Sequence, residues 1–498
     1  MEISTEQETG TTYGQNDPDV REALDALGRH LKDTTPRFYA PHGAAFGHQA
    51  STVQFLKRLI ALGVVRKAEL VYTSADVLGK LRVLLPQIEA EDAPPPFKVT
   101  SEGRTADVAL VRMSADGLTT PTEFAISGGW DYRNREEVQQ ATAQLRAGMV
   151  LIVQPYGWEK ERSAHESCVY LARTKEFIDL SDALSAQEFR WMLYSRPRPR
   201  VPDDAWEPLA ERQVTAGTVE ACRAVLDAVR GKKLLCPAYG VSDVGAGSAL
   251  YAPPPASFVF NLAGTFRVLQ GGDDPRFRKG AVILVLCALK PATWTMIKDR
   301  FGGGKIAMAA PTVDAFVQRH LDSGGTSKIL VRESMRDPKQ ITDAIGALKA
   351  DEVLILNLVN VPHEVFDLIY AEATLPSIFE GAATAGMAIP LGNPFFRFVD
   401  PLYITYPVLP LGGGETAESR RASEATKSLR TLPKDWPEKD EESVPPKVLA
   451  EYVRDAYTPG HAQYGYFRDF GPFLRDNPKQ EKLNAALLWL HAKKHLTT

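Results

Sequence analysis

Two groups of polar residues have the types and the spacing that chemistry needs. Ser377 and Glu380 stand three residues apart, before a run of small residues from Gly381 to Gly386, and this order predicts a helix that begins near Ser377. The unpaired N–H groups at the start of a helix suit a phosphate group. Ser-x-x-Glu is also a capping box, in which both side chains bond only to the backbone of the helix. The local pattern leaves both interpretations open.

The second group lies in the first half of the chain. His42 and His48 belong to a glycine-containing turn after an expected strand, and Asp131 follows Gly128 and Gly129 after another expected strand. Imidazole and carboxylate groups can act as general bases. His48, His42 and Asp131 are therefore candidates for acid–base chemistry. The structural alternative for His48 is a residue at the start of a helix that bonds to the backbone.

The elements around the two histidines form a βαβ unit. A strand at 37–41, a helix at 49–62 and a strand at 69–73 follow one another, and the turn after the first strand lies where open α/β sheets bind ligands. An aromatic and irregular region at 158–208 suits loops or helices that grip an acceptor. The other expected elements of this half are strands at 108–111, 123–126, 149–154 and 233–237 and helices at 18–31 and 219–229.

Apolar strands alternate with helices again from Ala281, as a parallel sheet covered on both faces requires. After the helix that starts near Ser377, we expect a strand at 387–390 and a tight turn at 392–394. The charged stretch 412–446 predicts a linker or an insertion, and closing helices are expected within 447–498. The other expected elements are strands at 281–289, 305–309, 328–331 and 353–358 and helices at 293–301, 313–320, 338–348 and 363–370.

Composition describes a globular chain of two large domains. The 498 residues are 44% hydrophobic and 24% charged, and a formal net charge of -4 without a local basic patch argues against nucleic acid as a partner. The four scattered cysteines lack the spacing of a zinc site or a disulfide framework. Residues 1–17 are polar, without a signal-peptide pattern, and we expect them to be disordered. No apolar run reaches the roughly 20 residues of a membrane span, so we expect a cytoplasmic location.

Two motifs, placed in two successive α/β halves, resemble the GT-B superfamily of sugar-nucleotide-dependent glycosyltransferases. They are the Gly43-x-x-x-Gly47-His48 turn and the segment PSIFEGAATAGMAIP at 376–390, and the resemblance at motif level covers 42–49 and 377–390. It implies two Rossmann-like doubly wound α/β domains that face a central cleft, with C-terminal helices packing across. The domain on the acceptor side is then 18–250, and the nucleotide-sugar domain is 251–411.

The resemblance also implies a donor site in the C-terminal domain. The phosphates would lie at Ser377, Gly381 and the neighbouring backbone N–H groups, and Glu380 would bind the ribose hydroxyls. The other implied contacts are Thr384 to the donor, Asn357 and Val361 to the nucleobase, and Arg332 and Lys290 to the charge of the diphosphate. For an inverting enzyme, the resemblance implies a base that activates the acceptor, with His48 as the first candidate, His42 as the second and Asp131 as the third.

These features predict a glycosyltransferase that moves a sugar from a UDP-, GDP- or TDP-linked donor to an unidentified small-molecule, peptide or glycan acceptor. The nucleotide-sugar is then a substrate, and no separate cofactor is expected. No Asp-x-Asp motif follows an expected strand, so the prediction requires no divalent metal. Two alternatives remain open: a sugar-nucleotide 2-epimerase or hydrolase of the same fold, and a non-catalytic binding scaffold of that fold.

Overall fold

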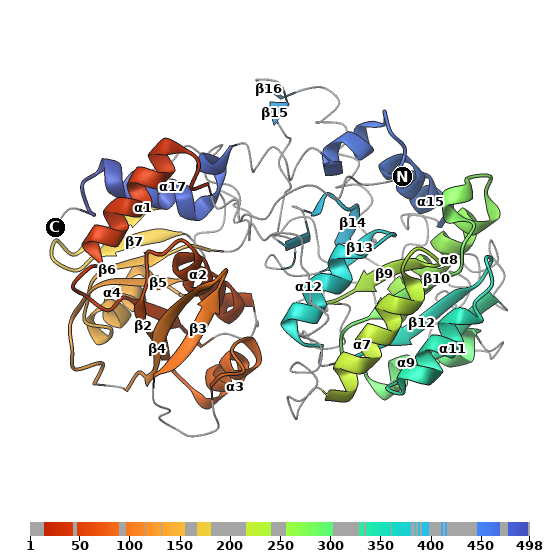
Figure 1. Ribbon diagram of the computed structural model, residues 1–498, viewed down its shortest axis with the longest axis horizontal. Helices are drawn as coiled ribbons and strands as arrows, with labels where there is room; N and C mark the ends of the chain where they lie inside the picture. Colours follow the sequence, from red (N-terminus) through yellow and green to blue (C-terminus); the bar gives the residue numbers. More distant parts are fainter. Residues whose placement is uncertain are drawn as a thin grey trace. The chain divides into compact units, whose positions relative to one another are not determined.

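The computed structural model divides the chain into two compact α/β units (Figure 1). Unit 1 comprises residues 1–197 and 472–498, and unit 2 comprises residues 198–471. The structure describes residues 14–42, 47–88, 96–114, 116–130, 132–154, 167–180, 216–240, 255–301, 328–332, 335–359, 361–379, 384, 387–388, 391–397, 410–411, 414–415, 446–468 and 477–496.

Unit 1 contains an eight-stranded sheet in the order β3-β4-β2-β1-β5-β6-β7-β8. The five strands from β4 to β6 run parallel, whereas β3 at one edge and β7 and β8 at the other pair antiparallel. The strand order reverses between β1 and β5. The chain continues from β1 to its neighbour β2 on one side, and from β5 to its neighbour β6 on the other. The strands are β1 (Arg37–Ala40), β2 (Lys67–Tyr72), β3 (Phe97–Ser101), β4 (Arg104–Arg112), β5 (Thr122–Ser127), β6 (Ala147–Ile152), β7 (Cys168–Leu171) and β8 (Glu176–Asp179).

The helices of unit 1 come from both ends of the chain. α2 packs against β1, β3, β4 and β5, α4 packs against β6 and β7, and α1 packs on the C-terminal helix α17 (Figure 1). The Asp17 side chain caps α1 by accepting the N–H groups of Asp19 and Val20. Residues 14–17, which we expected to be disordered, are therefore part of the fold. The helices are α1 (Pro18–His30), α2 (Gly47–Ala61), α3 (Ala75–Leu84), α4 (Arg135–Gln144) and α17 (Lys482–Ala492), preceded by the 3-10 turn η6 (Pro478–Gln480).

Unit 2 contains a six-stranded parallel sheet in the order β11-β12-β10-β9-β13-β14. Its strands β9, β10 and β12 are buried along their whole length, as the continuous apolar run from Ala281 to Val285 predicts. The strands are β9 (Leu234–Ala238), β10 (Ala281–Val285), β11 (Ile329–Arg332), β12 (Val353–Asn357), β13 (Ser377–Phe379) and β14 (Phe395–Arg397), with the separate hairpin strands β15 (Pro410–Leu411) and β16 (Gly414–Glu415).

The helices of unit 2 form two groups. α7 packs against α11 and α12, whereas α8 packs against α9 and α15. Apolar faces of these helices and of the sheet form the core, which includes Trp294, Ile341 and Ile369. The helices are α7 (Ala216–Val229), α8 (Pro255–Gly271), α9 (Pro291–Phe301), α11 (Pro338–Gly346), α12 (His363–Ala371) and α15 (Pro446–Ala456), with the 3-10 turn η2 (Pro275–Phe277) after α8.

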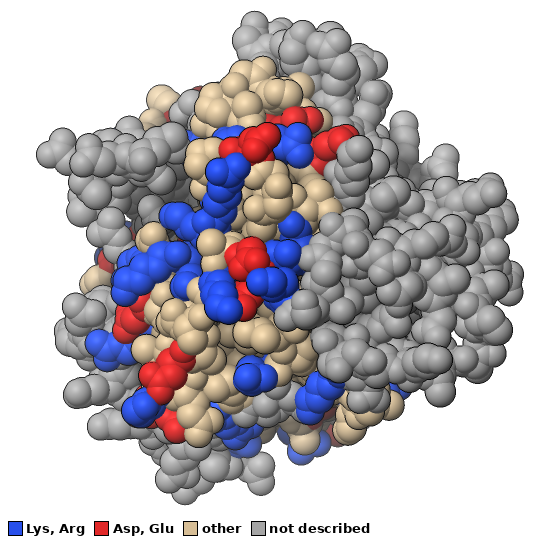
Figure 2. Space-filling view, turned by 90° about the vertical axis from the view of Figure 1, so that its right-hand side faces the viewer, with Lys and Arg blue, Asp and Glu red and all other residues tan. Residues whose placement is uncertain are grey.

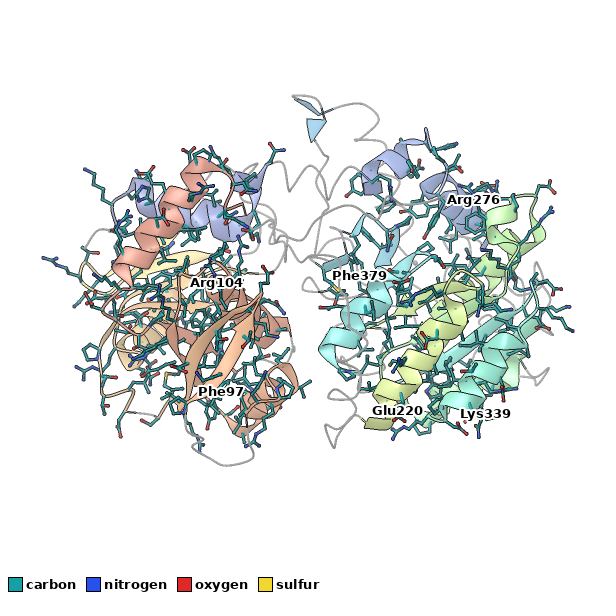
Figure 3. All side chains as sticks on the ribbon, in the orientation of Figure 1. Phe97, Arg104, Glu220, Arg276, Lys339 and Phe379 are labelled. Carbon is teal, nitrogen blue, oxygen red and sulfur yellow. The ribbon has the colours of Figure 1, made fainter. Side chains whose placement is uncertain are left out.

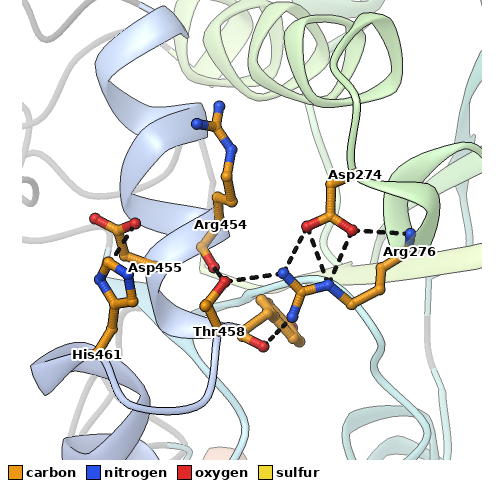
Figure 4. Close-up of polar contacts among 7 residues, drawn as sticks. Asp274, Arg276, Arg454, Asp455, Thr458 and His461 are labelled. Atoms are coloured by element: carbon orange, nitrogen blue, oxygen red, sulfur yellow. Dashed lines mark hydrogen bonds and ion pairs between the residues drawn. The ribbon is translucent and has the colours of Figure 1, made fainter.

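One arginine attaches the end of α15 to the turn η2 (Figure 4). Arg276 Nε donates to Asp274 Oδ1 at 2.9 Å, and Arg276 Nη2 donates to the Thr458 hydroxyl at 2.9 Å. Arg276 Nη1 also donates to the Tyr457 carbonyl, which follows the last turn of the helix. This hydrogen bonding to the guanidinium lowers the pKa of Asp274. A cation at a helix C-terminus satisfies free carbonyls, so these bonds hold α15 within unit 2.

Charges of both signs are mixed on the surface of unit 2. Lys339 pairs with Asp343, Lys328 with Asp351 and Arg278 with Asp273. Figure 2 shows Lys and Arg interspersed with Asp and Glu on one face of the molecule. The described part of this face therefore differs from the single-sign basic surface of a nucleic-acid-binding protein.

The predicted domain boundary near residue 250 is wrong. α7 and β9, which we assigned to the N-terminal domain, belong to unit 2, because β9 pairs with β10 and β13. The closing helices also divide, since α15 lies in unit 2 and α17 in unit 1. Among the elements that were not predicted are the strands β3, β7, β8 and β14 and the helices α3 and α4, and β7 and β8 fall inside the region that we expected to be irregular.

The structure also corrects the segment around Ser377. Ser377–Phe379 is the strand β13, paired with β9 and β14, and no helix begins at Ser377. Met387 and Ala388, where we expected a strand, are helical. The turn before β14 agrees with the prediction, since Gly392 has a positive φ of 69°. The expected strand at 305–309 and helix at 313–320 lie outside the described residues.

Candidate functional site

In unit 2, the carboxyl ends of β9 and β13 form the candidate site. β10 and its neighbours lie on one side of β9, and β13 and β14 lie on the other, so the strand order reverses between β9 and β13. Open α/β sheets bind ligands outside the carboxyl ends of their strands at such a reversal. The Tyr239 N–H donates to the Ile378 carbonyl at 3.0 Å, which joins the two strands at their ends. Phe379, labelled in Figure 3, ends β13 at this edge.

Glycine begins the segment that leaves β9. Gly240 has a φ of 82°, in the left-handed region that glycine adopts without strain. Glu380 and Gly381 directly follow Phe379 in sequence but lie outside the described residues. The sequence places a glycine within two residues of the end of each strand, and a residue without a side chain lets a ligand approach the backbone closely.

Ser377 does not have the role that the sequence predicted. It is the first residue of β13 and only 1% exposed, and its buried hydroxyl has no hydrogen-bond partner among the described residues. Ile378 is in register with Ala238, the last residue of β9, so Ser377 lies one residue short of the edge. The hydroxyl therefore neither caps a helix nor reaches the edge of the sheet where a phosphate would lie. The prediction that Ser377 caps a helix is therefore wrong.

Asn357 is the last residue of β12, and its side chain bonds to the chain at the end of the neighbouring strand β10. Its side-chain Nδ2 donates to the carbonyls of Val285 at 2.9 Å and Cys287 at 3.0 Å. Both amide hydrogens therefore bind the chain that leaves β10, and they cannot also bind a nucleobase. Val361 lies before α12 and is half-buried.

The two predicted cations lie on neighbouring parts of the same edge. Lys290 is exposed, and its carbonyl accepts the N–H groups of Thr293 and Trp294 at the start of α9. Arg332 ends the edge strand β11 and is exposed. Four strand spacings separate β11 from β13, a distance of about 19 Å. Arg332 is therefore too far from β13 to pair with a diphosphate bound there. Thr384 is helical and buried.

Buried polar groups that sequence reasoning missed lie beneath the candidate site. The Tyr370 hydroxyl donates to the Ile378 carbonyl at 2.6 Å, and Cys236 Sγ donates to the Pro376 carbonyl at 3.2 Å. Burial raises the pKa of Tyr370 well above its usual value and also raises the pKa of Cys236. Both groups therefore stay neutral at pH 7 and act as donors. They fix the backbone of β13, and their apolar contexts in helix α12 and strand β9 gave no signal of this role.

In unit 1, the corresponding edge is filled by helix α2. The strand order reverses between β1 and β5, but Gly128 after β5 approaches the first turns of α2 so closely that a Cβ there would lie 2.3 Å from the Ser51 carbonyl carbon. The Gly128 N–H donates to the Thr52 hydroxyl at 2.9 Å. Gly129 has a φ of 130°, which also favours glycine. No space for a ligand remains between Gly128 and α2.

The predicted bases of unit 1 differ in exposure. His48 lies in the first turn of α2 and is 0% exposed, so the folded chain does not present it to an acceptor. Its place in the first turn of α2 agrees with the position given in the structural alternative, and its burial does not favour the catalytic prediction. His42 follows β1 and is exposed. Asp131 lies outside the described residues, between Trp130 and Tyr132, which are both buried.

The described residues contain no group of three or more His, Cys, Asp or Glu that could hold a metal ion. In the same part of the chain, none of the helices combines the length and the apolar character that a membrane crossing requires.

Comparisons with known proteins give little information about this chain. No family model matches it, and no curated protein matches it. Among solved structures, an α,α-trehalose-phosphate synthase (UDP-forming) from Burkholderia xenovorans, in complex with glucose-6-phosphate, aligns with 97% of this chain and 78% of its own at 11% identity. The TM-score of this alignment is 0.25, and a likeness at that level carries no argument about fold or activity.

Proposed function

We propose that the chain is a GT-B glycosyltransferase that binds a nucleotide-diphosphate sugar at the carboxyl ends of β9 and β13. The observation that carries this proposal is the reversal of strand order in the all-parallel sheet of unit 2, with Gly240 in a left-handed conformation at the end of β9. A diphosphate needs backbone N–H groups that it can approach closely, and glycine at a strand end provides them.

The proposed donor site differs from the one that the sequence predicted. Glu380 keeps the role of binding the ribose hydroxyls, and Gly381 that of a phosphate contact, because both follow β13 at the reversal point. We no longer propose donor contacts for Ser377, Asn357 and Arg332. Ser377 is buried, the Asn357 side chain donates to other carbonyls, and Arg332 ends a distant strand. UDP-, GDP- and TDP-linked sugars remain the candidate donors, without a metal requirement.

The base that activates the acceptor is proposed to be His42 or Asp131. Among the predicted bases, His42 is the one that the structure describes as exposed, and an exposed imidazole can accept a proton from an acceptor. Burial of His48 favours the second candidate function, a non-catalytic scaffold that binds the nucleotide, because the first-choice base is inaccessible.

Donor binding is tested first by isothermal titration with UDP-, GDP- and TDP-sugars. We expect one donor family to bind, and Glu380→Ala to weaken its binding by about 1–3 kcal/mol through the loss of charge-assisted hydrogen bonds. Glu372→Ala is the matched control, because Glu372 pairs with Arg230 at 3.6 Å outside the proposed site. If no donor binds, or if both variants bind alike, the proposed site is wrong.

Turnover distinguishes the remaining alternatives. Incubation of the donor without an acceptor reveals a 2-epimerase or hydrolase, whereas the transferase requires an acceptor library. A chelator is expected to leave donor binding unchanged. His42→Ala is expected to abolish turnover and to leave donor affinity intact. A chain that binds donor but turns over nothing is the scaffold.

A further inference from the structure

Two aromatic residues lie at the ends of the strands that flank the reversal point of unit 2. Phe379 is the last residue of β13, and Tyr239 directly follows Ala238, the last residue of β9. Phe379 is 0% exposed, and its ring packs on Phe395 with centroids 5.0 Å apart. Tyr239 is half-buried, so part of its side chain stays exposed at this edge of the sheet. Of the two residues, Tyr239 is therefore the one that presents aromatic surface to a ligand.

Helix α12 supports the ring of Tyr239. Phe366 lies in the first turn of α12, which follows β12 and so begins at the carboxyl edge of the sheet. The rings of Phe366 and Tyr239 meet edge-on, with centroids 5.2 Å apart and an interplanar angle of 83°. Phe366 also packs on Tyr370, which is 0% exposed, with centroids 4.7 Å apart. The three rings form a row that runs from the core to the half-exposed Tyr239.

The backbone of Tyr239 is fixed as well as its ring. Its N–H donates to the Ile378 carbonyl at 3.0 Å, and the same carbonyl accepts the Tyr370 hydroxyl at 2.6 Å. The chain then turns away at Gly240, whose φ is 82°. An aromatic side chain has few rotamers, and one that the fold already holds loses little conformational freedom when a ligand binds. Tyr239 is therefore a preorganised surface.

The chemistry of this surface suits a planar ring. Nucleobases stack on tyrosine whatever their identity, because every base has a π-face. The proposed position of the diphosphate is the backbone at Gly240, the residue next to Tyr239. In a nucleoside diphosphate the ribose separates the base from the phosphates, and the tyrosine side chain likewise separates its ring from the backbone. A base on the ring of Tyr239 therefore leaves the diphosphate near the backbone of Gly240.

We propose that Tyr239 determines specificity for nucleotides, by stacking on the nucleobase of the donor with Phe366 as its support. This inference rests on the proposed function for the donor site in unit 2. Tyr239 takes the contact to the base that the sequence assigned to Asn357, whose amide hydrogens bind two carbonyls. Because stacking does not read the identity of the base, Tyr239 distinguishes nucleotides from phosphates that lack a base, and not one nucleotide from another.

Isothermal titration with UDP, GDP, TDP and inorganic pyrophosphate tests the stacking. We expect Tyr239→Leu to weaken the binding of each nucleotide that the wild type binds by about tenfold, and to leave the affinity for pyrophosphate unchanged. Tyr239→Phe keeps the ring and should bind as the wild type does. Tyr464→Leu, at a half-buried tyrosine elsewhere in unit 2, is the matched control. Wild-type nucleotide affinity in Tyr239→Leu overturns the proposal, as does an equal loss of affinity for pyrophosphate.

A spectroscopic measurement on the wild type covers the case in which Tyr239→Leu does not fold. In a chain with isotope-labelled tyrosine, we expect nuclear Overhauser effects between the base protons of the bound nucleotide and tyrosine ring protons, and we expect Tyr239→Phe to remove them. A bound nucleotide without these signals overturns the stacking.

Failure of the proposed function gives a different result from failure of this inference. If the wild type binds no nucleotide, the proposed donor site is wrong, and the inference falls with it. If nucleotides bind the wild type and Tyr239→Leu alike, the donor site stands and the stacking alone is wrong.

Discussion

The two sheets have the same reversal of strand order and differ in what occupies it. In unit 1, α2 fills the space beside β5, because Gly128 lies against the backbone of Ser51 and Thr52. In unit 2, β9 and β13 are joined at their ends by one backbone hydrogen bond, from Tyr239 to Ile378. Topology alone therefore does not define a nucleotide site. In unit 1, the packing of α2 against Gly128 leaves no room for a ligand at that point of the sheet.

The largest expected effect comes from Gly128→Ala, which breaks the close approach in unit 1. A Cβ at 2.3 Å from the Ser51 backbone cannot be accommodated unless α2 shifts. We expect unit 1 to lose about 3 kcal/mol of unfolding free energy in urea titration. Unit 2 and its donor affinity should be unaffected.

The control for Gly128→Ala is Gly79→Ala, within helix α3. An added Cβ at Gly79 meets nothing within 4 Å, and alanine favours the helix by about 0.5–1 kcal/mol. The two variants should therefore shift stability in opposite directions. Equal, small effects would show that α2 does not fill the reversal point of unit 1.

The pH dependence of unit 1 provides the next test. Burial lowers the pKa of Lys482 to about 7, opposed by the charge of Glu481. The unfolded chain keeps this proton up to a pKa near 10.4, so folding releases it above pH 7. The stability of unit 1 should rise from pH 7 to 9, with a slope that approaches about 1.4 kcal/mol per pH unit, and this contribution is lost as the pH falls to 7.

Lys482→Met isolates this contribution from other titrating groups. Urea titrations at pH 7, 8 and 9 should give a shallower slope for the variant than for wild type. Lys493→Met, at the exposed residue that follows α17, should keep the wild-type slope. Identical slopes for all three proteins would mean that Lys482 remains charged in the folded chain.

The alternation of apolar strands and helices predicted most of the parallel framework. β10 and β12 are continuous apolar runs, and the amphipathic stretch after His48 is indeed α2. The edge strands β3 and β8 alternate or are half-buried and carry polar residues, so their pattern was too weak to recognise. The domain boundary failed for a different reason. Strand β9 pairs with strands that follow it in sequence, and local patterns contain no information about pairing partners.

The candidate site was predicted less well than the fold. Ser377 was predicted to cap a helix from the Ser-x-x-Glu pattern, which is not specific to one structure. Pairing of β13 with β9 overrode this local preference. His48 is an example of a polar residue that packing buries completely. Tyr370 carried no signal, because it acts through the Ile378 carbonyl on a different element.

The smallest expected effect concerns the floor of the candidate site in unit 2. Tyr370→Phe removes the hydroxyl that donates to Ile378, but the Ile378 carbonyl still accepts the Tyr239 N–H. Because no buried acceptor is left unpaired, we expect a loss of only about 1 kcal/mol in the stability of unit 2. Donor affinity should stay at the wild-type value if the bond between Tyr239 and Ile378 alone sets the spacing of β9 and β13.

Tyr464→Phe, at a half-buried tyrosine elsewhere in unit 2, is the control for loss of a hydroxyl. A large drop in donor affinity for Tyr370→Phe alone would show that the tyrosine, and not the backbone pairing, holds the site open. In that case the two reversal points would differ in two helices: α12, which carries Tyr370 in unit 2, and α2, which packs against Gly128 in unit 1. The two units would then both depend on a helix: α12 would support the edge of the sheet in unit 2, and α2 fills the corresponding edge in unit 1.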